Sequence, residues 1–393
     1  MSGWKTVRIS DFCRTGTGGT PSRSNLERYY EGGTIPWVKS GELRETVINE
    51  TEEHVTEAAL QETNVKLVPA GALLLAMYGA TVGRLGILGV DATTNQAVCH
   101  IIPDPKVAEV RFLFYALCNQ VSNLIARGVG GAQPNISQGI IKDLVLALPP
   151  LTEQRRIAEV LDRAEALRAK RRAALAQLDS LSQSLFLDLF GDPATNSKGF
   201  PKKALNSLVR GDDTINYGVV QPGNDLDEGV PLVRVGDLID GKVKHADLKR
   251  IAPSIEATYK RSRLRGDEIL VSCVGSIGVV ALADESVKGF NIARAVARIP
   301  LAETTSRIFM AAYLKTDFVQ RYFTNELRTV SQPTLNIKQL SETLVVLPPI
   351  ELQREFARRV LAVEKLKSAQ RASLAEMDAL VASLQHRAFR GEL

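Results

Sequence analysis

The sequence of 393 residues predicts an α+β protein with two similar globular domains of mixed helix and strand, separated by two long antiparallel coiled-coil helices. Three observations predict this fold class. Leu148-Pro149-Pro150 returns 199 residues later as Leu347-Pro348-Pro349. Each Pro-Pro pair precedes a long run free of Gly and Pro, and the segments upstream of these runs carry a weaker repeat. Two copies of one module allow a pseudo-twofold internal repeat with two similar surfaces.

The repeat divides the chain into four segments. Residues 1–150 and 191–349 are expected to form the two globular domains, and residues 151–190 and 350–393 the central and distal long helices. A chain of this length accommodates two domains with their connecting elements.

The globular segments are predicted to contain short buried strands joined by glycine turns. Ile35–Val38 matches Val230–Val233, and the turn at Gly79–Gly83 matches the turn at Gly275–Gly278. These patterns are typical of α+β domains and do not fit repeated βαβ units.

Two further features of the globular segments can be compared between the halves. Arg111–Asn123 and Arg307–Phe323 each predict an amphipathic helix. Thr17–Glu31 has no counterpart that aligns with Asp212–Asp227. Such a difference is expected if each domain recognises a different target, and drift after duplication would explain it equally well.

The two long runs are rich in Ala, Leu, Arg, Glu and Gln, which favour helix. Their apolar stripe is narrow and nearly heptad, so each helix is expected to pack against one partner helix, the other copy. The residues predicted to pair are Leu161, Leu175, Leu178, Leu181 and Leu185, with Val360, Leu374, Met377, Leu380 and Leu384. Arg168, Arg171 and Arg371 lie on or beside the stripe; their side chains either extend into solvent or form a polar patch for another subunit.

Composition sets limits on the class of protein. The net charge of +5 permits a polyanionic partner without requiring one. The four cysteines form no CxxC pair, which favours a reducing compartment over a disulfide scaffold. The uncharged stretches Leu67–Gly83 and Ile269–Ala283 are too short to span a membrane and contain glycines. We therefore expect a cytoplasmic protein.

Motifs for covalent chemistry are missing from the sequence. There is no GxxxxGK[ST] phosphate loop and no Asp-Pro-Pro-Tyr or Asn-Pro-Pro-Phe tetrapeptide of amino-methyltransferases. The four histidines are scattered, and Asp240-Gly241-Lys242 is interpreted as a solvated turn. We therefore predict no catalytic, cofactor-binding or metal-binding residue in this chain.

Basic residues suggest where a nucleic acid could bind. Between Lys242 and Arg265 the sequence has eight basic and two acidic residues, as expected for phosphate contacts, although a solvated basic face would look the same. From this segment we select Lys242, Lys244, Arg263 and Arg265, and from the first half Lys39, Arg44, Arg84 and Arg127.

Two loops contain amide side chains that could read bases. Gln133 and Asn135 lie in the first loop, and Gln332 and Asn336 lie in the second. Asn and Gln can pair bidentately with adenine in the major groove. They can equally cap turns, as an Asn next to Pro usually does.

Taken together, these residues resemble the specificity subunit of a type I restriction-modification system. The resemblance covers the whole chain and rests on the order of Gly19–Ser22, Gly33–Leu43, Gln133–Ser137 and Leu148–Pro150 followed by Glu153–Ile157. It implies two target-recognition domains, each reading one half of a bipartite DNA site, with antiparallel helices setting the distance between half-sites.

The resemblance also implies partners and cofactors. Two modification subunits would bring S-adenosylmethionine and methylate adenine N6, and restriction subunits would add ATP- and Mg-dependent translocation and cleavage. The second half departs from the pattern, since Tyr217-Gly218-Val219 replaces the Gly-Thr-Pro-Ser opening. That departure leaves the half-site sequence open.

Two alternative functions are compatible with the sequence. The chain could be a self-contained methyltransferase or nuclease, which turnover by the purified chain would reveal. It could also be a coiled-coil scaffold with no DNA role, which a DNA-binding assay at two salt concentrations would address.

Overall fold

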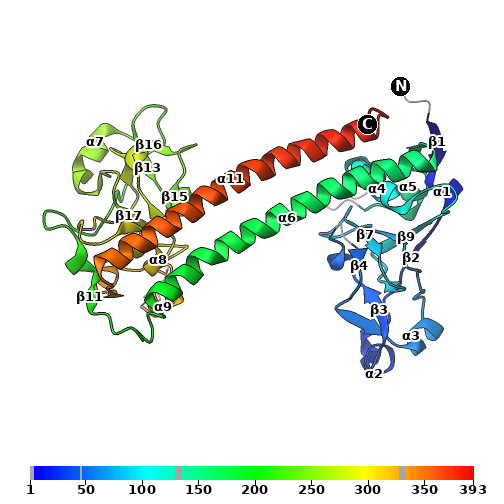
Figure 1. Cartoon of the computed structure of the whole chain (residues 1–393), viewed down its shortest axis with the longest axis horizontal. Helices are drawn as coiled ribbons and strands as arrows, with labels where there is room; N and C mark the ends of the chain where they lie inside the picture. Colours follow the sequence, from blue (N-terminus) through cyan, green and yellow to red (C-terminus); the bar gives the residue numbers. More distant parts are fainter. Residues whose placement is uncertain (1–3, 45–46, 129–134, 327–332) are drawn as a thin grey trace. The chain divides into compact units, whose positions relative to one another are not determined.

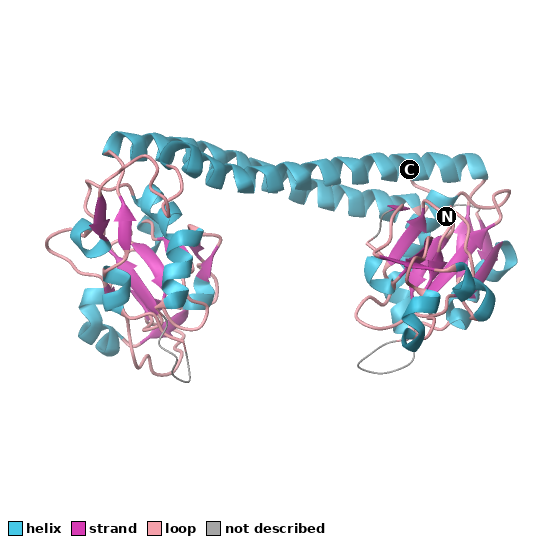
Figure 2. Cartoon of the chain, turned by 90° about the horizontal axis from the view of Figure 1, so that it is seen from below, coloured by secondary structure: helices cyan, strands magenta, loops and turns pink. Residues whose placement is uncertain are grey.

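The computed structural model describes residues 4–44, 47–128, 135–326 and 333–393. The chain folds into two compact units, the first formed by Met1–Arg172 with Ala372–Leu393 and the second by Ala173–Arg371. Each unit therefore contains one globular domain and part of both long helices, α6 (Leu151–Phe190) and α11 (Ile350–Ala388) (Figure 1). Within each unit the strands gather in the globular part and the long helices run along one side of it (Figure 2).

The first unit is built on a five-stranded sheet with the order β2-β9-β6-β7-β4. These strands are β2 (Cys13–Thr17), β9 (Val98–Pro103), β6 (Leu73–Ala76), β7 (Leu85–Leu88) and β4 (Val47–Ile48). A second sheet consists of β5 (Glu53–Val55), β3 (Ile35–Val38) and β8 (Thr93–Thr94), while β1 (Lys5–Arg8) pairs with β10 (Val145–Leu148). The helices are α1 (Ile9–Phe12), α2 (Leu26–Tyr29), α3 (Glu57–Glu62), α4 (Val110–Ala126) and α5 (Gln138–Lys142).

The second unit repeats this plan. Its main sheet has the order β12-β20-β17-β18-β15-β14, from β12 (Asn216–Tyr217), β20 (Val296–Ile299), β17 (Ile269–Ser272), β18 (Val280–Leu282), β15 (Lys242–Val243) and β14 (Leu238–Ile239). The smaller sheets join β16 (Lys249–Ile251), β13 (Val230–Val233) and β19 (Asn291–Ile292), and β11 (Lys202–Ala204) with β21 (Leu344–Val346). The helices are α7 (Pro253–Glu256), α8 (Arg307–Leu314), α9 (Asp317–Asn325) and α10 (Ile337–Ser341).

The two units differ in the helix that covers the main sheet. The first has the continuous helix α4, as predicted. The helix predicted over Arg307–Phe323 is interrupted instead, because Thr316 adopts an extended backbone and its hydroxyl donates to the carbonyl of Tyr313 at 2.7 Å. The prediction of one helix was therefore wrong at this point, and α8 and α9 take its place.

The recurring Leu-Pro-Pro and Gln motif has a structural explanation. Gln154 and Gln353 are both 1% exposed at the start of the long helices. The Gln154 side-chain oxygen accepts from the backbone N–H of Glu109 at 2.9 Å, and its nitrogen donates to the carbonyl of Pro149 at 2.9 Å. Gln353 accepts from the backbone N–H of Ser306 at 2.9 Å and donates to the carbonyl of Pro348 at 2.8 Å. Each glutamine thus ties a long helix to the N-cap of the helix covering the sheet.

Within each unit the two long helices run antiparallel. In the first unit, Ile157 and Leu161 of α6 share a core with Leu384 and Ala388 of α11. In the second unit, Phe186 and Phe190 of α6 pack edge-on against Phe356, with ring centroids 5.7 and 5.3 Å apart.

Each long helix carries a series of buried or half-buried positions spaced alternately by four and three residues, which we call the seam. The series in α11 is the series in α6 shifted by 199. The seam comprises Ile157, Leu161, Ala164, Arg168, Arg171, Leu175, Leu178, Ser182, Leu185 and Leu189 in α6, and Phe356, Val360, Val363, Lys367, Gln370, Leu374, Met377, Val381, Leu384 and Ala388 in α11.

Two residues predicted to pair the helices lie outside this seam. Leu181 is 39% exposed and Leu380 is 56% exposed, and the seam positions are taken by their neighbours Ser182 and Val381. A strict seven-residue repeat decides the buried face, so a leucine one residue away turns outward. Among the residues described, no helix combines the length and the apolar character that crossing a bilayer requires.

Candidate nucleic-acid interface

One end of the main sheet in the first unit collects three connecting loops. Thr17 at the end of β2 pairs with Cys99, and Ala76 at the end of β6 pairs with Val98 at the start of β9. The segments 18–22, 77–84 and 95–97, which follow or precede these residues, therefore lie at the same end of the strands. We call this end of the sheet the loop end of the first unit.

The glycine-rich segment at this loop end is held by its backbone. A Cβ at Gly18 would collide with the carbonyl of Thr94, so this position requires glycine. The backbone N–H of Gly19 donates to the Thr94 carbonyl at 2.9 Å, and its carbonyl accepts from the Trp37 indole at 3.1 Å. The Tyr30 hydroxyl donates to the carbonyl of Pro21 at 2.7 Å. These bonds fix the path of the segment.

Three of the predicted DNA-binding residues belong to this end of the first unit. Arg84 precedes β7, Arg127 ends α4, and Asn135 precedes Ile136, whose backbone N–H donates to the Met77 carbonyl at 2.7 Å. All three side chains are exposed, and within the described ranges neither arginine forms an ion pair. They are cations and an amide available to a ligand.

Lys39 and Arg44 are in different situations. The ammonium of Lys39 lies 2.8 Å from a Glu52 oxygen and 2.9 Å from a Glu53 oxygen. The hydrogen bond to Lys39 lowers the pKa of Glu52, so both groups stay charged near neutral pH. Lys39 is therefore committed to an intramolecular ion pair, whereas Arg44 is exposed.

The second unit has a loop end of the same construction. A Cβ at Gly218 would collide with the carbonyl of Ile292, and the backbone N–H of Val219 donates to that carbonyl at 2.7 Å. Gly218 thus occupies the position of Gly18, so the sequence departure at Tyr217–Val219 preserves the backbone arrangement. The backbone N–H of Leu335 donates to the Cys273 carbonyl at 2.9 Å, as that of Ile136 does to Met77.

An arginine at this second loop end was not selected from the sequence. Arg294 is exposed in the loop between β19 and β20, and its charge counteracts the rise in the pKa of Tyr217 to about 12 that burial causes. A single basic residue in a loop gives no sequence signal; only the register of β12 and β20 places it here.

The basic segment Lys242–Arg265 does not form a free cationic patch. Arg263 lies 2.6 Å from the carboxylate of Glu256, which is 4% exposed, and this hydrogen bond lowers the pKa of Glu256. Arg265 lies 3.5 Å from Asp212, and Lys244 lies 3.4 Å from Asp247.

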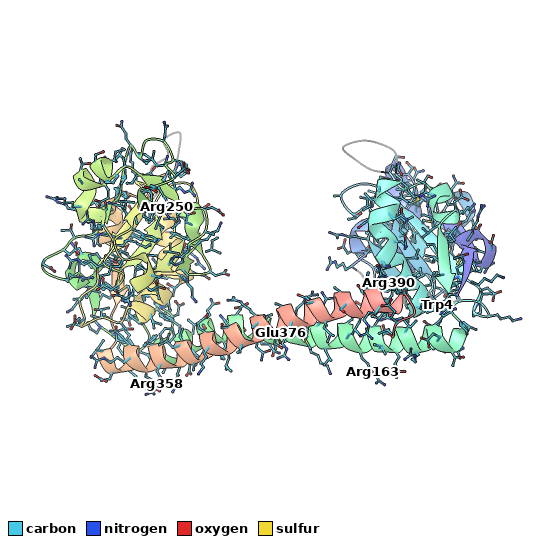
Figure 3. The ribbon with its side chains drawn as sticks, turned by 90° about the horizontal axis from the view of Figure 1, so that it is seen from above. Trp4, Arg163, Arg250, Arg358, Glu376 and Arg390 are labelled. Atoms are coloured by element: carbon cyan, nitrogen blue, oxygen red, sulfur yellow. The ribbon has the colours of Figure 1, made fainter. Side chains whose placement is uncertain are left out.

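Two other basic residues of this segment, Arg250 and Lys242, do not contribute to a free cationic patch at the loop end either. Arg250, labelled in Figure 3, donates to the carbonyl of Gly229 at 3.1 Å. Lys242 pairs with Leu282, at the opposite end of β18 from the loop end. Most of the predicted phosphate-binding residues of this half are thus engaged within the domain.

The structure describes two of the four amide residues predicted to read bases, Asn135 and Asn336. Gln133 and Gln332 lie outside the described residues. Asn336 is the N-cap of α10 and forms a capping box with Gln339, so its side chain serves the helix. Asn135 is exposed, and the corresponding helix α5 is capped by Ser137 instead.

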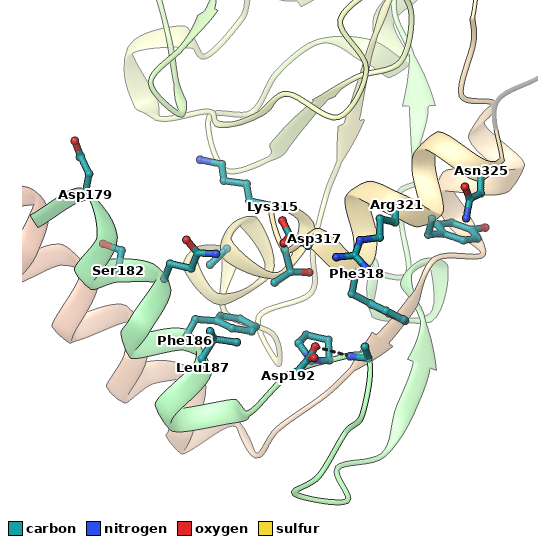
Figure 4. Close-up of a pocket in the computed structure, with 16 residues that line it drawn as sticks. Asp179, Ser182, Phe186, Leu187, Asp192, Lys315, Asp317, Phe318, Arg321 and Asn325 are labelled. Carbon is teal, nitrogen blue, oxygen red and sulfur yellow. Dashed lines mark hydrogen bonds between the residues drawn. The ribbon is translucent and has the colours of Figure 1, made fainter. Parts of the chain in front are cut away.

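A cavity of about 910 Å³ in the second unit lies beside the interruption between α8 and α9 (Figure 4). One wall is the last part of α6, with Ser182, Phe186 and Leu187, and the opposite wall carries Lys315 and Arg321. Desolvation by surrounding atoms lowers the pKa of Lys315. The cavity is lined by apolar, polar and charged side chains and contains no paired nucleophile and base among these lining residues.

The thiols and acidic clusters offer no reactive centre in the described part of the chain. Burial raises the pKa of Cys13, Cys99 and Cys273 to about 12, so these thiols stay protonated near neutral pH. Across the described ranges, no three His, Cys, Asp or Glu side chains gather in a group that could hold a metal ion. The geometry favours binding at the loop ends over covalent chemistry.

Comparison with known proteins agrees with this arrangement. The chain matches the family model described as type I restriction modification DNA specificity domain twice, over residues 1–177 and 212–376. It is 33% identical over 330 residues to the type I restriction enzyme EcoBI specificity subunit of Escherichia coli, which covers 77% of this chain and 69% of that protein.

Solved structures share the fold at lower sequence identity. A chain from a structure of complex assembly and conformational transition of the type I R-M system has a TM-score of 0.64 and 20% identity, covering 100% of this chain and 99% of that one. The type I restriction-modification S subunit from M. genitalium has a TM-score of 0.59 and 17% identity, covering 98% of this chain and 96% of that one.

Proposed function

Since the chain belongs to the family of type I restriction-modification DNA specificity subunits, which are non-catalytic members of their complexes, we propose that it binds a bipartite, asymmetric DNA site and positions the modification and restriction subunits on it. The observation that carries this proposal is the repeated loop end. Gly18 and Gly218 hold the same backbone arrangement in the two units, while the side chains around them differ. Two reading surfaces with one framework and different chemistry suit a site with two different halves.

The long helices supply the spacing in this proposal. The seven-residue repeat of seam positions supports an antiparallel coiled coil with pseudo-twofold symmetry. Forty residues of α6 would extend about 60 Å at 1.5 Å per residue. Half-sites one turn of B-DNA apart are separated by about 34 Å, which is within the reach of such a coiled coil.

Exposed leucines on the helices support the partner assignment. Leu167 and Leu380 are 51% and 56% exposed in the first unit, and Leu181 and Leu366 are exposed in the second. Apolar side chains left outside a seam on both halves suit two docking surfaces, one for each of two modification subunits. In this proposal S-adenosylmethionine, ATP and Mg belong to the partner subunits, and the complex acts on DNA in the cytoplasm.

A domain exchange tests the bipartite site. The chain with residues 1–150 replaced by the first domain of another specificity subunit is expressed with its modification subunits, and methylated sites are mapped. We expect one half of the methylated sequence to change and the other to stay. A change in both halves, or methylation without any fixed sequence, would refute the proposal.

A further inference from the structure

A groove of about 520 Å³ lies at the loop end of the first unit. Its walls come from the glycine-rich segment, from the residues after α3, and from the loop before β9. The lining side chains are small or polar, including Thr20, Ser22, Asn25, Asn64 and Gln96. Resting on the DNA-binding function proposed above, we propose that this groove reads base edges in one half-site, with Asn64 and Gln96 as specificity-determining residues.

The amide groups of the groove are available for hydrogen bonds to a ligand. Asn64, Asn25 and Gln96 are exposed. In the part of the chain that the structure describes, the side chains of Asn25 and Asn64 form no hydrogen bond. The Gln96 oxygen accepts from the hydroxyl of Thr20, which fixes the orientation of the amide, and no described residue accepts a hydrogen bond from its N–H₂ group. Free, oriented donors and acceptors are the groups that distinguish base pairs.

The charge of the groove favours bases over phosphates. Among the described residues that line it, the only charged one is Glu62, and Arg28 neutralises this carboxylate with a hydrogen bond of 2.7 Å from its Nε atom. The part of the lining that the structure describes includes no Lys or Arg to provide a counter-charge for a phosphate. Arg84 and Arg127 belong to the same end of the unit and can contact the backbone, while the neutral groove faces the base edges.

The equivalent place in the second unit has different chemistry. Gly218 matches Gly18, and the second residue after it is Val220, 49% exposed, where the first unit has Thr20. A valine offers apolar contact, such as to a thymine methyl group, and no hydrogen bond. Because this position differs between the two units, we assign the groove to the half-site read by the first unit.

The test uses the full chain in complex with its modification subunits. Methylation mapping first gives the wild-type site, and a duplex with this site is then compared with duplexes carrying single base-pair changes. The variants are Asn64→Ala and Gln96→Ala. The matched control is Gln61→Ala, since Gln61 is an exposed amide on α3 outside the groove.

We expect each groove variant to lose about 5- to 150-fold of discrimination at one base pair of one half-site. The slope of log affinity against log salt should stay unchanged, and so should the other half-site and the melting temperature. Gln61→Ala should behave as wild type.

Three results would overturn the proposal. Unaltered discrimination in both variants would remove the groove from base reading. A uniform loss across all sequences with a shallower salt slope would assign it to phosphate. A loss of thermal stability with the loss of binding would assign it to folding. If the wild-type complex itself binds without sequence preference, the DNA-specificity function fails, and this outcome is separate from the other three.

Discussion

Lys367 of α11 and Asp179 of α6 form an ion pair of 3.0 Å, and Lys367 is 7% exposed. The residues 199 positions away along the repeat, Arg168 and Asp378, form the equivalent pair at 2.8 Å in the first unit. In both units the cation also contacts a glutamate on its own helix, Glu364 or Glu165. Arg168, which the sequence places on or beside the apolar stripe, therefore lies in the seam and forms an ion pair with Asp378 of the other long helix.

These ion pairs should be energetically coupled to helix pairing. In a double-mutant cycle with Lys367→Ala and Asp179→Ala, we expect a coupling of about 0.5–1 kcal/mol, because Asp179 is partly solvated and salt screens the pair. Denaturant unfolding of the four variants measures it. The exposed pair Arg163 and Glu159 on α6 is the control, for which we expect a smaller coupling. A coupling in the seam no larger than in this control would contradict the prediction.

The buried glutamines should be essential for stability. Gln154→Ala would remove hydrogen bonds to two carbonyls and leave the backbone N–H of Glu109 without its partner, at a cost of about 2–3 kcal/mol in the free energy of unfolding. Gln353→Ala should act similarly. Gln177→Ala, at an exposed position of α6, is the matched control. A loss below half a kilocalorie, no greater than the control's, would count against the capping role.

Neighbouring leucines on α6 should respond differently to the same substitution. Leu178→Asp places a charge in the seam and should unfold or strongly destabilise the chain. Leu181→Asp should leave the free energy of unfolding nearly unchanged, since its side chain is turned outward. It should still weaken assembly with the modification subunits. Unfolding curves and light scattering of the complex measure the two effects, and equal destabilisation by both variants would refute the assigned seam.

Arginines at different places should affect DNA binding in different ways. Arg84→Ala should lower affinity equally across sequences and reduce the slope of log affinity against log salt by about 0.9. Arg263→Ala should instead destabilise the fold, because it leaves the buried Glu256 carboxylate without its cationic partner. Binding at several salt concentrations, together with melting temperatures, separates the two. An unchanged slope for Arg84→Ala would exclude it from the phosphate contacts.

The first unit should lose stability in mild acid because of His100. Burial lowers the pKa of His100 below its ordinary value of 6.5, with a further contribution from Lys66. Below that value the unfolded chain takes up a proton that the folded chain does not, so the free energy of unfolding falls as the pH falls from about 6.5. Denaturant unfolding at pH 7.5 and 5.5 measures the fall. His100→Gln should show a smaller fall, and an equal one would contradict the assignment.

The sequence was sufficient for the features that depend on local patterns. Both long helices begin directly after the Pro-Pro pairs, as predicted, and α6 ends at Phe190 before Gly191. The distal helix, predicted over residues 350–393, ends earlier, at Ala388. The sequence was insufficient for the phase of the seam, since Leu181 is more apolar than Ser182 and local hydrophobicity favours the wrong residue. The interruption of the helix at Thr316 also lacks a glycine or proline to signal it.

The candidate interface was harder to predict, because it depends on strand register. Thr20, Asn64 and Gln96 are far apart in the sequence. The pairing of β2 with β9 brings the loops of Thr20 and Gln96 to one end of the sheet, and the backbone of Asn64, after α3, packs against Gly19. The density of basic residues in Lys242–Arg265 was misleading for a related reason. The acids that neutralise Arg265 are Asp212 and Asp213, and Asp212 precedes Arg265 by 53 residues in the sequence.

The first unit is assembled from both ends of the chain, with the Leu393 carbonyl accepting a hydrogen bond from Arg156 at 2.7 Å and Phe389 packed on Phe112. The second unit is one uninterrupted stretch. During synthesis the ribosome therefore releases every residue of the second unit before the first has its full core. We therefore expect the second unit to be able to complete its core during synthesis before the first unit, whose residues 1–172 gain the last turns of α11 only at the end of translation.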